Sequence, residues 1–287
     1  MILKQVDLYE YFKLARNGAT GGYLTVYART PSNELKPKLR PAALIFPGGC
    51  YQFLSDREGE PVALAFLGKG YVSFIMNYSV NESYPVPLHE ALMAVAYVRE
   101  NAERYSVNRD KIVAVGFSAG GHLAGLLATA TKTEIECLSI KTPALPDATI
   151  LSYPVVTMGE YTHECSRSVI SNGGKIPNDL LSVDKRVTNE SVPAFIWHTT
   201  EDVDVPMENS LLLVRAYRRA GVPFSYMVFE RGWHGLSLCN EETNDQKECD
   251  IRISAVSKWF ELALDWLSAR GFQVVNEFQK HRNENKF

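Results

Sequence analysis

The stretch that decides the fold runs from residue 112 to residue 122 and reads IVAVGFSAGGH. It opens with a short apolar run, typical of a strand that is buried on both faces of a sheet, and a segment of helical character follows it. Between the two lies G-x-S-x-G, in which Gly116 and Gly120 flank Ser118. A serine on a sharp strand-to-helix turn needs neighbours without side chains two positions away on each side. The stretch therefore predicts that Ser118 is a nucleophile on such a turn.

Short apolar runs alternate with segments of helical period on both sides of this turn. We expect strands at 23–27, 42–46, 72–77, 112–116, 148–153, 194–198 and 224–229, and helices at 61–67, 87–101, 120–131, 209–220 and 250–268. Pro61 and Pro87 suit first helical turns. This alternation indicates an α/β protein with a mostly parallel central sheet and helices on both faces. Residues 156–191 interrupt it with a polar, Gly- and Asn-rich segment, so we expect a single domain over residues 1–287 with a small lid-like insertion.

Length and composition fit a soluble α/β protein. The chain has 287 residues, 46% of them hydrophobic, and a formal net charge of −3 without a basic stripe, which argues against nucleic acid and anionic membranes as partners. The N-terminus lacks the apolar run of a signal peptide, and no stretch approaches the ~18 apolar residues of a membrane span. Five cysteines without a C-x-x-C pair argue against a disulfide framework and a zinc site. We expect a cytoplasmic monomer or homodimer without metal or cofactor.

A serine nucleophile needs a histidine as base and a carboxylate that orients the histidine. For a nucleophile on this kind of turn, the acid and then the base follow the serine along the chain. Only His234 and His281 lie after the acid candidates, and His281 sits in a charged tail, so we expect His234 in the loop RGWHG to be the base. The acid candidates after the strand at 194–198 are Glu201, Asp202 and Asp204, and Asp204 is also a candidate cap of the next helix.

Acyl transfer also needs backbone N–H donors where the carbonyl oxygen becomes negative. We expect one from Ala119, directly after the serine, and others from Gly49 and Cys50, which follow the early strand sequence ALIFPG. Cys50 is itself a candidate nucleophile, but neither a histidine nor a helix start accompanies it, so its amide is favoured over its thiol. Four other histidines are expected to be structural, and the one after the elbow is a candidate for the pocket wall: His89, His122, His163 and His198.

Together these stretches resemble the α/β-hydrolase superfamily, and within it the bacterial esterase/lipase-like branch that includes acetyl xylan esterases and feruloyl esterases. The resemblance spans roughly residues 24–267. It is carried by FPGGCY at 46–51, SDREGEPVA at 55–63, NYSV at 77–80, GFSAGGH at 116–122 and HTTEDVDVPMENS at 198–210. In that family the acid is the aspartate followed at the fourth position by proline, which implies Asp202. Cys50 stands where the family usually has a third glycine.

The resemblance implies the α/β-hydrolase fold and a serine carboxylic-ester hydrolase. The site residues that it implies are Ser118, Asp202 and His234 for a catalytic triad, and Gly49, Cys50 and Ala119 for an oxyanion hole. The substrates that it implies are small acyl esters, above all acetyl esters, on a carbohydrate such as an imported acetylated oligosaccharide. A general carboxylesterase and an arylformamidase acting on small aromatic metabolites are alternatives. In another class, a ligand-binding protein of this fold would keep the pocket and lose the chemistry, usually by losing the base or the nucleophile.

Overall fold

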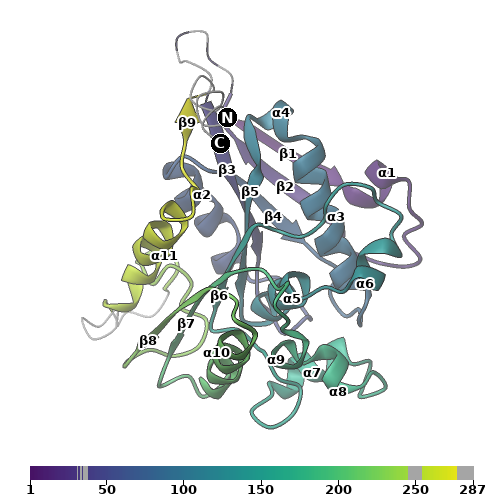
Figure 1. The fold of residues 1–287 in the computed structure, drawn as a ribbon, viewed down its shortest axis with the longest axis vertical. Coiled ribbons are helices and arrows are strands. Elements are labelled where there is room, and N and C mark those ends of the chain that lie inside the picture. Colours follow the sequence, from purple (N-terminus) through teal and green to yellow (C-terminus); the bar gives the residue numbers. More distant parts are fainter. Residues whose placement is uncertain (31, 33, 35–37, 245–253, 277–287) are drawn as a thin grey trace.

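The computed structural model describes residues 1–30, 32, 34, 38–244 and 254–276, and its centre is a mostly parallel sheet (Figure 1). Within these residues the sheet has nine strands: β1 (Ile2–Asp7), β2 (Tyr23–Ala28), β3 (Lys38–Phe46), β4 (Val72–Asn77), β5 (Val107–Phe117), β6 (Ala148–Ser152), β7 (Ala194–Thr199), β8 (Phe224–Phe229) and β9 (Val275–Asn276). Their order is β1-β2-β4-β3-β5-β6-β7-β8, and β9 pairs with β3. From β4 to β8 neighbouring strands are parallel, whereas β2 is antiparallel to β1 and to β4.

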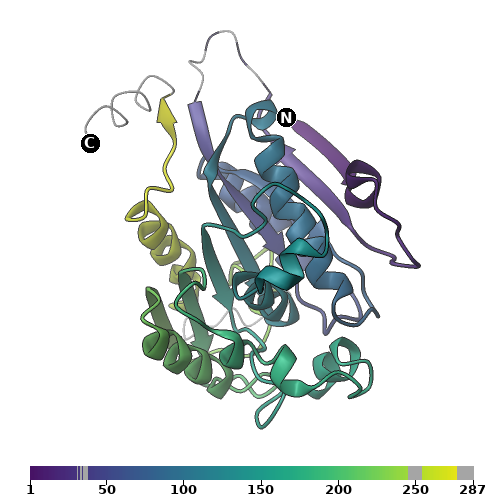
Figure 2. The same ribbon diagram turned by 45° about the vertical axis from the view of Figure 1, so that its right-hand side comes forward.

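Helices cover both faces of the sheet, as the sequence predicts. They are α1 (Leu8–Phe12), α2 (Glu60–Gly68), α3 (Val86–Glu100), α4 (Ala102–Tyr105), α5 (Ser118–Ala128), α6 (Lys132–Glu136), α7 (Glu164–Ile170), α8 (Asn178–Leu181), α9 (Val183–Arg186), α10 (Glu208–Ala220) and α11 (Trp259–Ser268), with 3-10 turns η1 (Asp56–Glu58) and η2 (Val256–Lys258). One apolar core lies between the sheet and α3, α5 and α10, and a second lies between the sheet and α2 and α11. Figure 2 shows α3 and α11 on opposite sides of the strands.

The strand β5 shows how the sheet contributes side chains to both apolar cores. Ile112 and Ala114 belong to the first core, whereas Val113 and Val115 belong to the second. Successive side chains of a strand point to opposite faces, so a continuous apolar run serves both cores. The parallel register places the carboxyl ends of β3, β5, β6 and β7 at one edge of the sheet. The predicted fold class is confirmed, and this edge is where ligands bind in open α/β sheets.

Several predicted elements keep their place, and others change. Pro61 and Pro87 lie in the first turns of α2 and α3, as predicted. The predicted strand at 148–153 ends one residue early, because Tyr153 has φ +35° and turns the chain out of the sheet. The insertion at 156–191 contains α7, α8 and α9, which Figures 1 and 2 both show beyond one end of the sheet, near α5 and α10. The sequence did not predict β1, α1 or β9.

Part of the C-terminal sequence prediction lies outside the described residues. Of the helix predicted at 250–268, residues 250–253 are not described, and η2 and α11 occupy the remainder from residue 256 onward. His281 and the charged tail also lie outside the described ranges. Within those ranges, no helix is both long enough and apolar enough to cross a membrane.

Candidate active site

Ser118 lies at the junction of β5 and α5, at the carboxyl edge of the sheet. Its backbone has φ +52°, a left-handed conformation that residues other than glycine adopt only where the surrounding structure enforces it. A Cβ atom added to Gly116 would lie 2.4 Å from the carbonyl oxygen of Gly120, and one added to Gly120 would lie 2.1 Å from that of Phe46. The first glycine therefore makes room for the turn itself, and the second makes room for the end of β3.

His234 joins Ser118 to Asp202 through its two ring nitrogens. Its Nε2 lies 2.7 Å from Oγ of Ser118, and its Nδ1 lies 2.7 Å from Oδ2 of Asp202. Because a carboxylate only accepts hydrogen bonds, Nδ1 carries the proton and Nε2 accepts from the serine hydroxyl. These side chains follow β5, β7 and β8, so the structure brings together the serine, the acid and the base that the sequence predicts. Such an arrangement can activate a serine hydroxyl.

The Asp202 carboxylate is buried and accepts hydrogen bonds on both oxygens. Its Oδ1 accepts from the backbone N–H groups of Asp204 and Val205, at 3.2 and 2.9 Å. Its Oδ2 lies 3.2 Å from Nε2 of His198, in addition to its contact with His234. Burial alone would raise the pKa of Asp202, but the hydrogen bonds from His198 and His234 hold this pKa well below its usual range. Asp202 is therefore an anion at neutral pH.

His198 is a contact of the acid that the sequence analysis missed. It is fully buried, its Nδ1 lies 2.7 Å from the hydroxyl of Ser210, and its Nε2 lies 2.8 Å from the carbonyl oxygen of Val205. Both neighbours of Nε2, this carbonyl and Asp202, are acceptors, so Nε2 carries the proton. His198 thus donates a hydrogen bond to the acid through Nε2. Its place four residues before Asp202 is the sequence signal that could have identified it.

The other two carboxylates of this loop turn elsewhere. Glu201 pairs with Arg231 and accepts from the N–H group of Gly232 at 2.9 Å, so it holds the loop that carries the base. Asp204 is exposed and does not cap the next helix, contrary to expectation, because α10 begins at Glu208 and its N-cap residue is Met207. The N–H group of Asp204 donates to the Asp202 carboxylate instead.

The amides predicted for the oxyanion hole lie beside the elbow. Phe46 at the end of β3 is paired with Gly116 at the end of β5, so the segment 47–53, which we call the oxyanion loop, starts next to the nucleophile. Within the described residues, the N–H groups of Gly49, Cys50 and Ala119 have no protein acceptor. Ala119 also lies in the first turn of α5, where unpaired N–H groups and the helix dipole favour negative charge. These free donors can hold an oxyanion.

The Cys50 thiol interacts electrostatically with the thiol of Cys165, on α7. Burial, together with the nearby Cys165 and Asp204, raises the pKa of Cys50 to about 11. The thiol is therefore protonated at neutral pH, which makes it a poor nucleophile and favours the backbone amide as the functional group of Cys50.

His163 is the residue of the insertion that interacts electrostatically with His234. This residue is the N-cap of α7, where its Nδ1 lies 2.9 Å from the hydroxyl of Ser166. Burial lowers the pKa of His163, and the electrostatic interaction with His234 lowers it further. His163 of the insertion therefore lies near the histidine that the sequence predicts as the base.

His122 links the oxyanion loop to the insertion. Its Nδ1 lies 2.7 Å from the hydroxyl of Tyr51, and its Nε2 lies 2.8 Å from the carbonyl oxygen of Leu181 on α8. With no exposed surface it does not line the pocket, contrary to expectation. Burial lowers the pKa of His122 to about 4, despite the opposing hydrogen bond to Leu181. His89 lies outside the site, against the thiol of Cys137.

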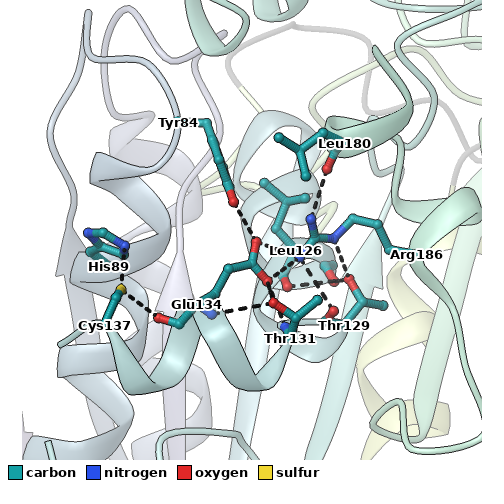
Figure 3. A network of polar contacts seen from close by, with 10 residues as sticks. Tyr84, His89, Leu126, Thr129, Thr131, Glu134, Cys137, Leu180 and Arg186 are labelled. Atoms are coloured by element: carbon teal, nitrogen blue, oxygen red, sulfur yellow. Dashed lines mark hydrogen bonds and ion pairs between the residues drawn. The ribbon is translucent and has the colours of Figure 1, made fainter. Parts of the chain in front are cut away.

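A buried ion pair fixes the far end of the insertion (Figure 3). We call this cluster the insertion anchor, and its residues are Tyr84, Thr129, Thr131, Glu134 and Arg186. A guanidinium nitrogen of Arg186 on α9 lies 2.8 and 2.7 Å from the two carboxylate oxygens of Glu134 on α6. The hydroxyl of Tyr84 and the N–H group of Thr131 donate to the same carboxylate. Burial alone would raise the pKa of Glu134, but the hydrogen bonds from Arg186, Thr131 and Tyr84 hold it below its usual value.

Comparison with known proteins places the chain among esterases. The BD-FAE family matches residues 31–158. The chain is 38% identical over 236 residues to the endo-1,4-beta-xylanase B of Butyrivibrio fibrisolvens, and 29% identical over 201 residues to the acetylxylan esterase of Xylanibacter ruminicola. These matches cover 78% and 67% of this chain. The chain itself spans 36% and 40% of the lengths of these two relatives.

A solved structure matches over almost the full length of both chains. It is the acetyl ester-xyloside bifunctional hydrolase from Caldicellulosiruptor lactoaceticus, with a TM-score of 0.79 and 30% sequence identity over 94% of this chain and 97% of that one. The likeness therefore extends over nearly the whole fold. The chain belongs to the α/β-hydrolase superfamily, in its esterase-like branch.

Proposed function

We propose that this chain is a carboxylic-ester hydrolase that works through an acyl-enzyme on Ser118. The observation that carries the proposal is the hydrogen-bonded series of Ser118, His234 and Asp202 beside free backbone N–H groups. Membership of the esterase-like branch supports it. The names of the similar proteins from Xylanibacter ruminicola and Caldicellulosiruptor lactoaceticus are those of ester hydrolases.

In the proposed reaction, Nε2 of His234 takes the proton of the Ser118 hydroxyl as Oγ bonds to the carbonyl carbon. The carbonyl oxygen becomes negative and accepts hydrogen bonds from the free N–H groups of the oxyanion loop and of Ala119. The ester C–O bond then breaks, and His234 gives the proton to the leaving alcohol. Water repeats the sequence on the acyl-enzyme and releases the acid. Asp202 holds the Nδ1–H group and stabilises the imidazolium.

Labelling and kinetics test this mechanism. A fluorophosphonate probe should modify the wild type at Ser118, and Ser118→Ala should abolish labelling. Ser118→Ala, His234→Ala and the double variant should lose similar fractions of kcat, because the two groups act as one unit. Independent losses that multiply in the double variant would contradict the mechanism. A wild-type protein that neither turns over esters nor takes the label would be a binding protein.

We propose small acyl esters on a carbohydrate as the substrates, with acetyl as the acyl group. Support comes from the two named relatives, an acetylxylan esterase and an acetyl ester-xyloside hydrolase. Nitrophenyl esters of increasing acyl length, acetylated xylo-oligosaccharides, methyl ferulate and an N-formyl aromatic amine test the proposal. We expect kcat/KM to be highest for acetyl esters and for the acetylated sugar. A preference for longer acyl chains, for the ferulate or for the formamide would contradict the substrate proposal and leave the mechanism intact.

We also propose that residues 156–191 form a lid over this site within a single domain of residues 1–287. At the base of the segment, the N–H group of Val155 donates to the carbonyl oxygen of Ser118 at 3.1 Å, and His163 interacts electrostatically with His234. A cytoplasmic location, the absence of a cofactor, and a monomeric or homodimeric state stay predictions from the sequence.

A further inference from the structure

A buried carboxylate that the proposed mechanism does not use lies behind the oxyanion loop. Glu58, in η1, is 3% exposed. Its Oε2 accepts from the N–H group of Gly48 at 2.7 Å, and its Oε1 accepts from the hydroxyl of Tyr153 at 2.7 Å. Within the described ranges, no Lys or Arg forms an ion pair with it. A buried carboxylate held by neutral donors is less favourable for folding than an apolar residue of similar size, so packing alone does not account for it.

The first partner of Glu58 belongs to a peptide unit that is held at both ends. The N–H group of Gly48 donates to Glu58, and the carbonyl oxygen of Pro47 accepts from the hydroxyl of Tyr78 at 2.7 Å. A peptide unit is planar, so fixing its N–H and its C=O fixes the direction in which the chain leaves it. The chain that leaves it carries the two free amides of the oxyanion loop. Glu58 therefore helps to set the direction of those amides.

The same carboxylate lies close to the nucleophile. A Cβ atom added to Gly48 would lie 2.7 Å from Oε2 of Glu58 and 3.0 Å from Cβ of Ser118. Oε2 of Glu58 and Cβ of Ser118 therefore both border the space that the missing side chain of Gly48 leaves open.

The second partner of Glu58 belongs to the loop of the base. The Tyr153 hydroxyl accepts from the N–H group of Ser237 at 2.9 Å, so its own proton is available for Glu58. The Tyr153 ring packs edge-on against the His234 ring, with centroids 5.0 Å apart. The hydroxyl of Ser237 also donates to the carbonyl oxygen of Arg57 at 2.6 Å, next to Glu58 in the chain. Residues 232–238, which we call the histidine loop, are thereby tied to η1.

We propose that Glu58 is a positioning residue that sets the oxyanion loop and the histidine loop in one fixed relation. One carboxylate oxygen holds the loop that carries the oxyanion donors, and the other holds, through Tyr153, the loop that carries the base. The role rests on the proposed ester hydrolysis, in which both loops must meet the same carbonyl group. It also gives a function to the sequence SDREGEPVA at 55–63.

Kinetics of Glu58→Gln and Tyr153→Phe test the role. The glutamine amide has one acceptor oxygen, so it cannot serve both donors, and the phenylalanine removes the link to the histidine loop alone. We expect Glu58→Gln to lower kcat by roughly tenfold to a hundredfold with KM within threefold, less than the hundredfold or more for loss of an oxyanion donor itself. Tyr153→Phe should lower kcat by a smaller factor, and the double variant should lose clearly less than the product of the single losses.

Glu60→Gln is the matched control. Glu60 lies two residues away in the chain and also accepts from a tyrosine hydroxyl, that of Tyr27 at 3.1 Å, but its side chain is exposed, and within the described residues it has no hydrogen bond to either loop. Its kcat should stay within twofold of the wild type. Hydrogen exchange gives a readout that needs no turnover, because peptides from both 46–55 and 231–240 should exchange faster in Glu58→Gln and should be unchanged in Glu60→Gln.

The outcomes separate this inference from the proposed function. Absence of ester turnover in the wild type would overturn the function, and the exchange experiment would still decide the coupling of the loops. The inference is overturned if Glu58→Gln keeps wild-type kcat, if KM rises in place of the fall in kcat, or if exchange quickens in one loop alone. Should Glu58→Gln fail to fold, Tyr153→Phe decides: unchanged kcat together with unchanged exchange at 231–240 would overturn it.

Discussion

Two buried carboxylates of this molecule, Glu58 and Glu134, are held in opposite ways. Glu134 in the insertion anchor faces the guanidinium of Arg186 as well as neutral donors, whereas the hydrogen-bond donors to Glu58 among the described residues are the neutral groups of Gly48 and Tyr153. In an ion pair, the opposite charge offsets the cost of burying the carboxylate. Among neutral donors, that cost is offset only if each donor points at a carboxylate oxygen. From this difference we infer that the insertion anchor attaches the insertion to the domain, whereas Glu58 fixes the oxyanion loop relative to the histidine loop.

The largest expected effect is on the rate, at the active site. Asp202→Asn should lower kcat by about ten-thousandfold, because the asparagine favours the wrong tautomer of His234 while the geometry survives. Glu201→Gln, in the same loop, should lower kcat by less than tenfold. Steady-state kinetics and melting curves measure both variants, and the melting temperature of Asp202→Asn should stay near that of the wild type. If Glu201→Gln or Asp204→Asn is the inactive variant, the acid is assigned wrongly.

The insertion anchor should show the reverse behaviour. Arg186→Met leaves Glu134 buried without its cation and should lower the free energy of unfolding by about 3–5 kcal/mol, with kcat retained in the folded fraction. Arg167→Met is the control, because Arg167 pairs with Glu164 in the same insertion but on the surface, and it should change stability by less than about 1 kcal/mol. Urea unfolding and active-site titration measure both quantities. A large loss of kcat without a loss of stability would remove the contrast between the two regions.

His122 lies between the two regions, and we expect it to make the stability of the folded chain depend on pH. Its pKa is lowered to about 4 in the folded chain by burial, and the charge of Arg186 acts in the same direction. Above pH ~6.5 the imidazole is neutral in both states, whereas between pH ~6.5 and pH 4 the unfolded chain alone takes up the proton. Stability should therefore fall as the pH falls through this window, by an amount on the order of 3 kcal/mol.

Unfolding of the wild type and of His122→Asn at pH 7 and at pH 4.5 measures this contribution. The variant should be less stable at pH 7, because Tyr51 and Leu181 lose a partner, but its stability should depend less on pH. Parallel pH curves for the two proteins would show that His122 does not titrate on unfolding.

The smallest expected effect on kcat concerns Cys50, and it separates the role of the thiol from that of the backbone amide. Cys50→Ala removes the thiol and its contact with Cys165 but keeps the backbone amide, so kcat should fall by less than tenfold. Cys50→Gly should behave alike, because φ at residue 50 is +59°, a conformation that glycine adopts readily. A thousandfold loss of kcat in both variants would show that the thiol takes part in the chemistry.

The elements that the sequence predicts are those with a strong local signal. The strands β4 and β8 have the predicted bounds, because each is a short, mostly apolar run, although β8 at the edge of the sheet is only partly buried. The strand β1 escaped prediction, since only Val6 of its six residues is buried and the rest pair along an antiparallel edge. The insertion helices α7, α8 and α9 are four to seven residues long, and tertiary contacts such as the insertion anchor hold them. Short polar helices of this kind carry little periodic signal.

The site, too, contains residues that the sequence predicts and residues that it does not. Ser118, Asp202 and His234 could be named from a motif, a chain order and a family pattern, and the structure places them within hydrogen-bonding distance. The residues that hold the surrounding loops in place, Glu58 and Tyr153, could not be predicted. Glu58 and Tyr153 are 95 residues apart in the chain and meet only because the chain after β6 turns toward η1. No local pattern records a contact of that kind.

The parallel pairing of β3, β5, β6 and β7 has a consequence for how this protein acquires its activity. Each group of the proposed triad follows a different strand, and His234 and Ser118 are 116 residues apart. Contacts between distant parts of a chain form slowly, because the entropy of closing long loops is lost before the contacts compensate for it. In a refolding experiment, helical circular dichroism should therefore return first, and labelling of Ser118 should appear only with the last phase, as a marker of completed assembly.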